Sequence, residues 1–256
     1  SVISPNMDAL AEDGTLFTNG YSSTPSSTPA RSGLLTGLSP WHHGMLGYGR
    51  VASQYRYEMP RMLGDLNYYS FGIGKMHWYP QKALHGFRGT LVDESGRVES
   101  PDFISDYRLW FQMQAPGLNP DSTHIGWNDH GAATYKLPER LHPTAWTGEM
   151  ACEMIRNYEG INNQPLFLKI SFARPHSPYD PPKRYLDMYK DADIPKPSVG
   201  DWCGKYAERL DPEKVAPDAP FGNFGDEYAV KSRRYYYANI TFIDDQIGEI
   251  IAVLKE

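Results

Sequence analysis

The chain of 256 residues is long enough to bury the core of one large α/β domain, and its formal net charge is −6 at pH 7. This charge argues against nucleic acid as a partner, because surfaces that bind phosphate backbones are commonly basic. No apolar stretch approaches the roughly 20 residues that span a bilayer, and Cys152 and Cys203 are too far apart to suggest a zinc or redox motif.

Helical patterns and short apolar runs alternate along the chain. Terminal signals and apolar periodicity predict helices at 5–14, 27–37, 144–158 and 231–255. An extended segment is predicted at 16–19, and β-branched and aromatic residues predict strands at 67–74 and 166–172. This alternation favours a layered α/β/α fold around a mostly parallel sheet.

A long stretch in the middle of the chain lacks any clear periodicity. Roughly from 86 to 143 it is rich in Gly, Pro, Asp and Trp, which is typical of loops. We therefore predict a loop-rich insertion there. Long loops of this kind commonly carry substrate specificity.

The run from 27 to 37 combines a hydroxyl and an arginine at the start of a helix. Thr28 and Pro29 favour a helix start, since proline lacks the amide hydrogen that the first turn leaves unused. Ser27 then lies where free N–H groups and the helix dipole favour an anion, and Arg31 follows about one turn later. A serine hydroxyl needs activation to act as a nucleophile, so this run predicts only part of an active site.

Two histidine motifs follow the predicted strands. Gly-Lys-Met-His occupies 74–77, and Pro-His-Ser-Pro occupies 175–178. Ligands bind at the carboxyl ends of strands in parallel α/β sheets, so both motifs lie at the edge where a site is expected. Taken alone, Lys75 could be a solvated loop charge, and His176 could simply hydrogen-bond a turn.

The three motifs, in this order, resemble the signature of the type I, formylglycine-dependent sulfatases of the alkaline-phosphatase-like superfamily. The resemblance extends to 5–10, 181–185 and 237–248, whereas the middle of the chain matches loosely. It implies that the enzyme is a sulfuric ester hydrolase acting on a sulfated carbohydrate or aryl sulfate. It also implies a periplasmic or secreted location and a maturation enzyme that generates formylglycine.

The resemblance assigns a role to each residue of the motifs. Ser27 would be oxidised to formylglycine and bind the metal, and Arg31 would hold the aldehyde hydrate. Lys75 would bind the sulfate and steady the formylglycine. His77 would remove a proton from the sulfated diol, and His176 would contact the sulfate and protonate the leaving oxygen. Cations around developing negative charge and an acid for the leaving alcohol suit sulfuryl transfer.

The family resemblance also implies a Ca²⁺ ion, held by an Asp-Asp pair before the first helix and an Asp-His or Asp-Asn pair after the last. Neither pair lies in this chain. We therefore expect 1–256 to be the N-terminal part of a sulfatase catalytic domain that lacks its first and last metal-ligand strands. Because a hard cation takes about six to eight oxygen ligands, residue 27 alone would not hold it, and this part alone is expected to be inactive.

Other polar motifs favour structural interpretations. Asp244 and Asp245 are adjacent within a periodic helix, so a structural or capping role is favoured over metal binding. Asp129 and His130 are weaker metal candidates. Asn239 begins a glycosylation motif, but its helical setting favours chance.

Substrate contacts and the state of the nucleophile stay open. Basic and aromatic residues near the motifs would suit a sulfated sugar, and the candidates are Arg50, Trp78, His85, Arg88 and Trp127. Serine at position 27 fits the serine-type sulfatases of bacteria, but also a disabled enzyme. The alternatives are a phosphate or phosphonate ester hydrolase with unmodified serine, and an inactive relative that binds sulfated glycans.

Overall fold

A computed structural model describes residues 1–158, 163–219 and 221–256. Its centre is a three-stranded parallel sheet in the order β2-β1-β3, formed by β2 (Gly89–Val92), β1 (Tyr69–Gly74) and β3 (Leu166–Ser171). In the central strand, Ile73 lies opposite Leu91 on one side and Ile170 on the other. The predicted strands at 67–74 and 166–172 and the parallel sheet are confirmed.

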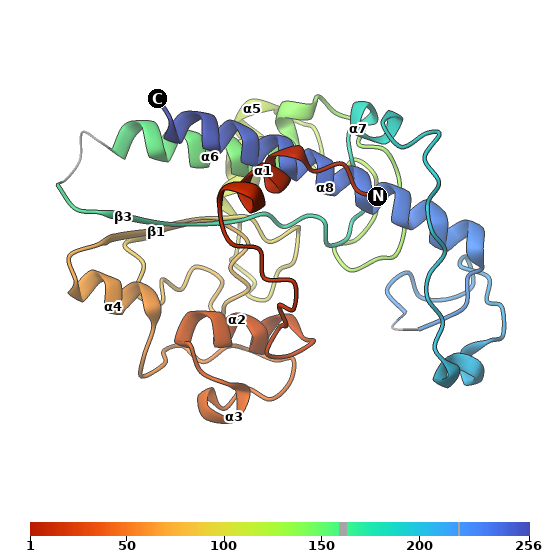
Figure 1. The fold of residues 1–256 in the computed structure, drawn as a ribbon, viewed down its shortest axis with the longest axis horizontal. Helices are drawn as coiled ribbons and strands as arrows, with labels where there is room; N and C mark the ends of the chain where they lie inside the picture. The colour runs from red at the N-terminus through yellow and green to blue at the C-terminus, as the bar shows by residue number, and fades with distance from the viewer. Residues whose placement is uncertain (159–162, 220) are drawn as a thin grey trace.

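Two long helices cover one face of the sheet. Figure 1 shows α6 (Pro143–Tyr158) and α8 (Asp226–Leu254) running side by side above the strands. The fully buried Ile73 packs in one apolar cluster with Ala151 of α6 and Ile250 of α8. The helices predicted at 144–158 and 231–255 are confirmed, and the second begins five residues earlier than expected.

Shorter helices lie on the other face (Figure 1). These are α2 (Ser27–Thr36), α3 (Pro40–His43) and α4 (Met59–Asp65). Leu35 of α2 packs with Met76 in the apolar cluster of this layer. The three layers agree with the predicted α/β/α fold.

The first helix is attached to the last one by a buried carboxylate. Asp244 of α8 accepts hydrogen bonds from the backbone N–H groups of Asn6 and Met7 at 3.0 and 2.8 Å, at the start of α1 (Pro5–Asp13). These N–H groups have no partner within their own helix, so Asp244 satisfies them as a cap would. The predicted structural role of Asp244 is confirmed. Asn239 is 0% exposed, which excludes a glycan there.

The region 86–143 consists mostly of loops and turns, but it also contains regular elements that were not predicted. It contains β2, α5 (Asp106–Gln114) and the 3₁₀ helix η1 (Glu139–Leu141). The four residues of β2 are too few for a periodic signal, and β2 is defined by its pairing with β1. The segment 16–19 is also not a strand, because it joins no strand ladder and turns at 18–19.

Two further short helices complete the described elements, α7 (Lys183–Asp187) and η2 (Asp201–Tyr206). Cys152 is buried, Cys203 is half-buried, and both are free thiols. Within the described ranges, none of the helices combines the length and apolar character needed to cross a bilayer.

Candidate active site

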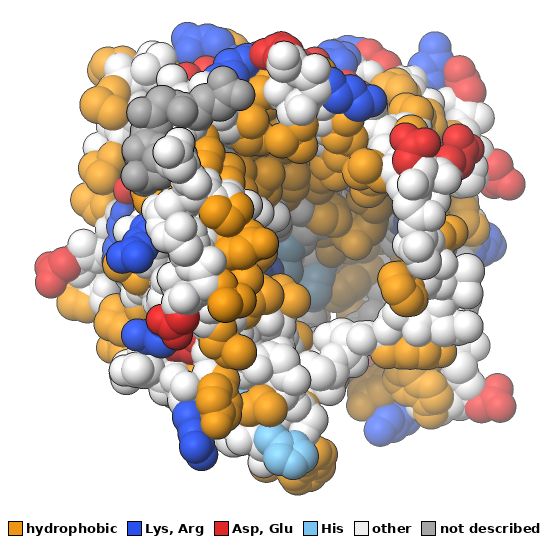
Figure 2. Space-filling view, turned by 60° about the vertical axis from the view of Figure 1, so that its left-hand side comes forward, with side chains coloured by type: hydrophobic (Ala, Val, Ile, Leu, Met, Phe, Trp, Pro, Cys, Tyr) orange, Lys and Arg blue, Asp and Glu red, His pale blue; other side chains and the backbone are white. Residues whose placement is uncertain are grey.

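The three sequence motifs meet at one open pocket. Ser27 and Arg31 come from the start of α2, His77 follows β1, and His176 follows β3. All four line a cavity of about 1260 Å³. Figure 2 shows a hollowed face of the molecule, with histidine and basic side chains in its depth and hydrophobic side chains along its wall.

The start of α2 sets the geometry of the serine and the arginine. The helix begins at Ser27 and ends at Thr36, where Gly37 adopts a left-handed φ of 69° and its N–H donates to the carbonyl of Gly33. Residues four apart on a helix lie on the same face, and the Arg31 Nε donates to Ser27 Oγ at 3.2 Å. Arg31 therefore orients the hydroxyl oxygen.

His77 is placed to act on that oxygen. Its Nδ1 lies 2.8 Å from Ser27 Oγ. Burial, followed by the positive charge of Arg97, lowers the pKa of His77 to about 2, so the imidazole is neutral. Nδ1 of a neutral imidazole can accept the serine proton, which makes His77 a candidate base.

The backbone of His77 is held in an uncommon conformation. Its φ is +61°, in the left-handed region that few residues other than glycine adopt. The Glu94 carboxylate accepts hydrogen bonds from the N–H of Met76 at 3.1 Å and of His77 at 2.7 Å. Glu94 in turn pairs with Arg97.

Several cations lie close together beside Ser27. Arg31 and Lys169 both donate to the backbone carbonyl of Lys75, at 3.3 and 3.2 Å. Burial, followed by the charge of Arg31, lowers the pKa of Lys75 to about 8 and that of Lys169 to about 7. Cations crowded in this way are stabilised by an anion, and a tetrahedral oxyanion such as sulfate suits them.

His176 lies at the edge of the pocket. Its Nδ1 is 3.2 Å from the carbonyl oxygen of Ser177, to which it can donate. Its ring stacks on Trp127, with the centroids 6.4 Å apart and the planes at 20°. Partial burial, followed by Lys75, lowers the pKa of His176, and a bound anion would raise it again.

The structure places most of the predicted substrate contacts outside the pocket around Ser27. Trp78 and His85 are buried in the core, where their rings lie 4.7 Å apart and His85 Nδ1 is 2.7 Å from the Glu58 carboxylate. Arg50 lies over the ring of Tyr79, and Arg88 is exposed; neither lines the pocket around Ser27. Proximity in sequence is a poor guide to direction, because a side chain's orientation depends on its packing. Of this group, Trp127 lines the pocket.

The sequence analysis missed Glu94 and Arg97, which support His77, and Tyr48, whose ring meets the His77 ring edge to face at 5.8 Å. The segment Asp-Glu-Ser-Gly-Arg at 93–97 follows β2 directly. If the sequence had revealed β2 as a parallel strand, the position of segment 93–97 at its carboxyl end would have indicated a site.

A calcium site does not fit the described residues by themselves. In those ranges, no three or more His, Cys, Asp or Glu side chains gather in a way that could hold a metal ion. Asp129 accepts from the N–H of Gly126 at 2.6 Å, and His130 Nε2 lies 2.5 Å from the carbonyl of Ala219, so both serve loop contacts.

Comparisons with known proteins relate the chain to a protein family. Residues 2–256 match the family model described as Sulfatase. An arylsulfatase of Clostridium perfringens is 35% identical over 98% of this chain and 54% of its own length. A choline-sulfatase of Rhizobium meliloti is 28% identical over 98% of this chain and 49% of its own.

The fold is also found in solved structures. A phosphonate monoester hydrolase of Agrobacterium radiobacter superposes with a TM-score of 0.75 at 23% identity, over 100% of this chain and 55% of its own. At that identity the likeness shows a shared fold. The chain spans about half the length of the curated relatives it matches.

Proposed function

The chain belongs to the sulfatase family of the alkaline-phosphatase-like superfamily, and from this premise we propose that the complete protein hydrolyses sulfate esters with position 27 as its nucleophile. The observation that carries the proposal is the 2.8 Å contact between Ser27 Oγ and the neutral His77 Nδ1. This contact lies in a pocket lined by Arg31, beside Lys75 and Lys169.

Position 27 suits a formylglycine. Its oxygen has a donor in Arg31 and an acceptor in His77, lies at a helix N-terminus, and faces an open pocket that a substrate can enter. A maturation enzyme that carries its own electron acceptor would remove two hydrogens from Ser27 and give an aldehyde. Addition of water to the aldehyde would give the hydrate, whose oxygen is a better nucleophile than the serine hydroxyl.

The surrounding residues then divide the work. Arg31 orients the oxygen at position 27, and His77 takes its proton at Nδ1 as this oxygen attacks sulfur and the bond from sulfur to the leaving oxygen breaks. Loss of the proton from the second hydroxyl of the sulfated hydrate then breaks its carbon–oxygen bond to sulfate, which releases sulfate and restores the aldehyde. Lys75 and Lys169 supply positive charge toward the sulfate, where charge develops in the transition state. His176, at the edge of the pocket and with its pKa raised by the bound anion, protonates the leaving oxygen.

We propose a sulfated carbohydrate or an aryl sulfate as the substrate. The Trp127 ring, stacked on His176, provides an aromatic surface next to the group that would protonate the leaving alcohol. Aromatic surfaces favour ring-shaped partners, which both substrate classes supply. The same cations would hold a phosphoryl group, so a phosphate or phosphonate ester is the second candidate.

Calcium and a periplasmic or secreted location belong to the proposal for the complete protein. Position 27 would provide one oxygen ligand, and further oxygen ligands would come from elsewhere in that protein. Loss of activity on chelation, restored by added Ca²⁺, would support the metal. Fractionation of the producing cells tests the location.

Mass spectrometry of the peptide that contains residue 27, taken from the active protein, tests the nucleophile. We expect a loss of two hydrogens relative to serine. In parallel, turnover of 4-nitrophenyl sulfate, sulfated sugars, and the matching phosphate and phosphonate esters tests the reaction. If residue 27 has the mass of unmodified serine and phosphonate esters turn over faster than sulfate esters, the sulfatase proposal is wrong. The protein is then a phosphate or phosphonate ester hydrolase.

A further inference from the structure

Three consecutive residues after β2, Asp93, Glu94 and Ser95, contact both loops that carry the site histidines. Glu94 is 1% exposed, and one of its carboxylate oxygens accepts the N–H groups of both Met76 and His77, at 3.1 and 2.7 Å. Two successive N–H groups directed at one oxygen fix the path of the backbone. Glu94 therefore holds His77 in its left-handed conformation.

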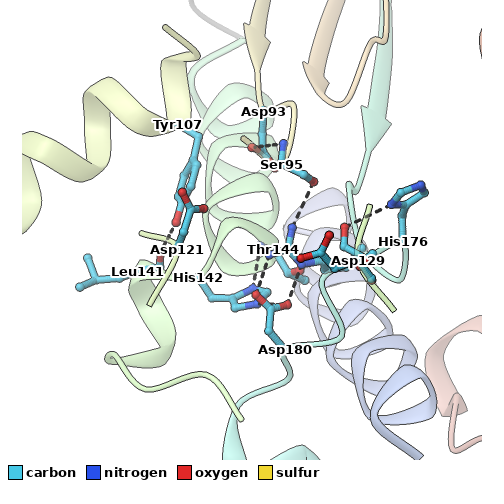
Figure 3. Close-up of polar contacts among 12 residues, drawn as sticks. Asp93, Ser95, Tyr107, Asp121, Asp129, Leu141, His142, Thr144, His176 and Asp180 are labelled. Carbon is cyan, nitrogen blue, oxygen red and sulfur yellow. Dashed lines mark hydrogen bonds and ion pairs between the residues drawn. The ribbon is translucent and has the colours of Figure 1, made fainter. Parts of the chain in front are cut away.

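Ser95 is bonded to the other loop. Its Oγ accepts a hydrogen bond from the Arg174 guanidinium at 3.1 Å, and Arg174 lies two residues before His176. The same guanidinium forms two parallel bonds of 2.7 Å with the Asp180 carboxylate, and His142 Nε2 lies 3.3 Å from that carboxylate (Figure 3). Bidentate pairs of this kind have strict geometry, so the Arg174 side chain is fixed against Asp180, and one hydrogen bond connects it to Ser95.

Asp93 shapes the turn between these two contacts. Its carboxylate accepts the N–H of Ser95 at 3.1 Å (Figure 3). Burial raises the pKa of Asp93, and the nearby Arg174 opposes that rise. A buried carboxylate beside a buried guanidinium is sensitive to small displacements, because neither group has water to replace a lost partner.

We propose that residues 93–95 position the two histidines against each other, with Glu94 acting on His77 and Ser95 acting, through Arg174, on His176. The proposal rests on the proposed sulfatase function. Neither Glu94 nor Ser95 lines the pocket, so both are positioning residues that leave substrate contact to the histidines. Their effect should appear in kcat and vanish when the histidine each one serves is removed.

A double-mutant cycle in the complete, matured enzyme tests the contact with His77. Because Glu94→Ala leaves two N–H groups without an acceptor, we expect kcat to fall roughly tenfold to a hundredfold, with a change in KM of less than about threefold. Glu94→Gln keeps an acceptor oxygen and should recover part of that loss. In the His77→Ala background, either substitution should change kcat by less than about twofold. Losses that multiply in the double mutant would overturn the proposal.

If Glu94→Ala does not fold, the cycle with Glu94→Gln decides in the same way. Glu58→Gln is the matched control. Glu58 is also fully buried, pairs with an arginine three residues later, accepts the N–H of Tyr55 at 3.0 Å and contacts a histidine, His85. We expect Glu58→Gln to lower stability and to leave kcat of the folded protein within about threefold.

A second cycle tests the contact with the loop of His176. Ser95→Ala should lower kcat in the parent enzyme, have little effect in His176→Ala, and keep its full effect in His77→Ala. If Ser95→Ala instead keeps its full effect in His176→Ala and loses it in His77→Ala, the role of Ser95 at the His176 loop is wrong.

A crystal structure of Glu94→Gln or Glu94→Ala separates failure of this proposal from failure of the proposed function. We expect the oxygen at position 27 and His77 Nδ1 to move beyond 3.5 Å in the alanine variant, with a smaller displacement in the glutamine variant. Unchanged distances in both would overturn the positioning role even if the enzyme acts on another ester. If the parent protein has no sulfatase activity but the distance from the oxygen at position 27 to His77 Nδ1 increases in the Glu94 variants, the proposed function is wrong. The positioning role of Glu94 then still stands.

Discussion

His77 and His85 are equally buried, at 4% exposure each, and both follow the end of β1, yet their surroundings differ completely. His77 faces the pocket with Nδ1 on Ser27 Oγ. His85 is enclosed by Trp78 and held by the Glu58 carboxylate. Residue type and burial are the same, so the partner of the ring nitrogen distinguishes a reactive histidine from a structural one.

The largest expected difference comes from removing each histidine in turn. His77→Ala should lower kcat roughly 10²- to 10⁴-fold, the range over which a positioned base contributes. His85→Ala should instead reduce the free energy of unfolding by about 1–3 kcal/mol, because it leaves the buried Glu58 with one partner fewer. Steady-state kinetics and urea unfolding of both variants measure the two effects. Similar losses of kcat in the two would remove the distinction.

His176 extends the comparison to a histidine at the edge of the pocket. If it protonates the leaving oxygen, His176→Ala should slow the hydrolysis of sulfated sugars roughly 10²-fold, and that of 4-nitrophenyl sulfate much less, because nitrophenolate leaves without a proton. The ratio of the two losses is the measurement. Equal losses on both substrates would indicate that His176 only binds the sulfate.

Much of the fold and the main site residues could be predicted from the sequence. β1 ends directly before Lys75-Met76-His77, and β3 ends shortly before Arg174-Pro175-His176, so the rule about strand ends locates both histidine loops. The start of α2 is equally local, since Pro29 and Gly37 mark its two ends. Local sequence signals were sufficient to predict a motif where the whole motif lies within one helix or closely follows one strand.

The parts that could not be predicted depend on tertiary contacts. β2 has four residues and is defined by its pairing with β1, so the role of Glu94 could not be inferred. Trp78 and His85 follow His77 closely in sequence, but they turn into the core because Glu58 and Phe87 surround them there. No sequence pattern shows which way a loop side chain points.

Lys169 shows the effect of surroundings on a cation. Its pKa is lowered to about 7, mainly by burial, whereas it is about 10.5 in the unfolded chain. Below pH 7 the folded protein must therefore hold a buried ammonium. Between pH 7 and 10.5 the unfolded chain binds a proton that the folded chain does not, so raising the pH stabilises the folded state.

Lys169→Met should accordingly stabilise the protein by about 1–3 kcal/mol at pH 6–7, with an advantage that shrinks toward pH 10. Urea unfolding of the variant and the parent across this range gives the difference directly. Lys190→Met, at an exposed lysine, is the control and should change stability by less than about 0.5 kcal/mol. An advantage for Lys169→Met that grows with pH would contradict the burial of its charge.

The smallest effect is expected at Trp127, whose ring stacks on that of a site histidine, His176. Trp127→Ala removes an aromatic surface of the pocket, and such a surface contributes about 0.5–1.5 kcal/mol to a ring-shaped partner. We therefore expect KM for sulfated sugars to rise about two- to tenfold while kcat changes little, because the His176 ring keeps its Nδ1 contact with the Ser177 carbonyl. Trp127→Phe should restore most of the binding. A fall in kcat that equals the rise in KM would mean that Trp127 also orients His176, which would extend the positioning contacts of residues 93–95 to the other side of the pocket.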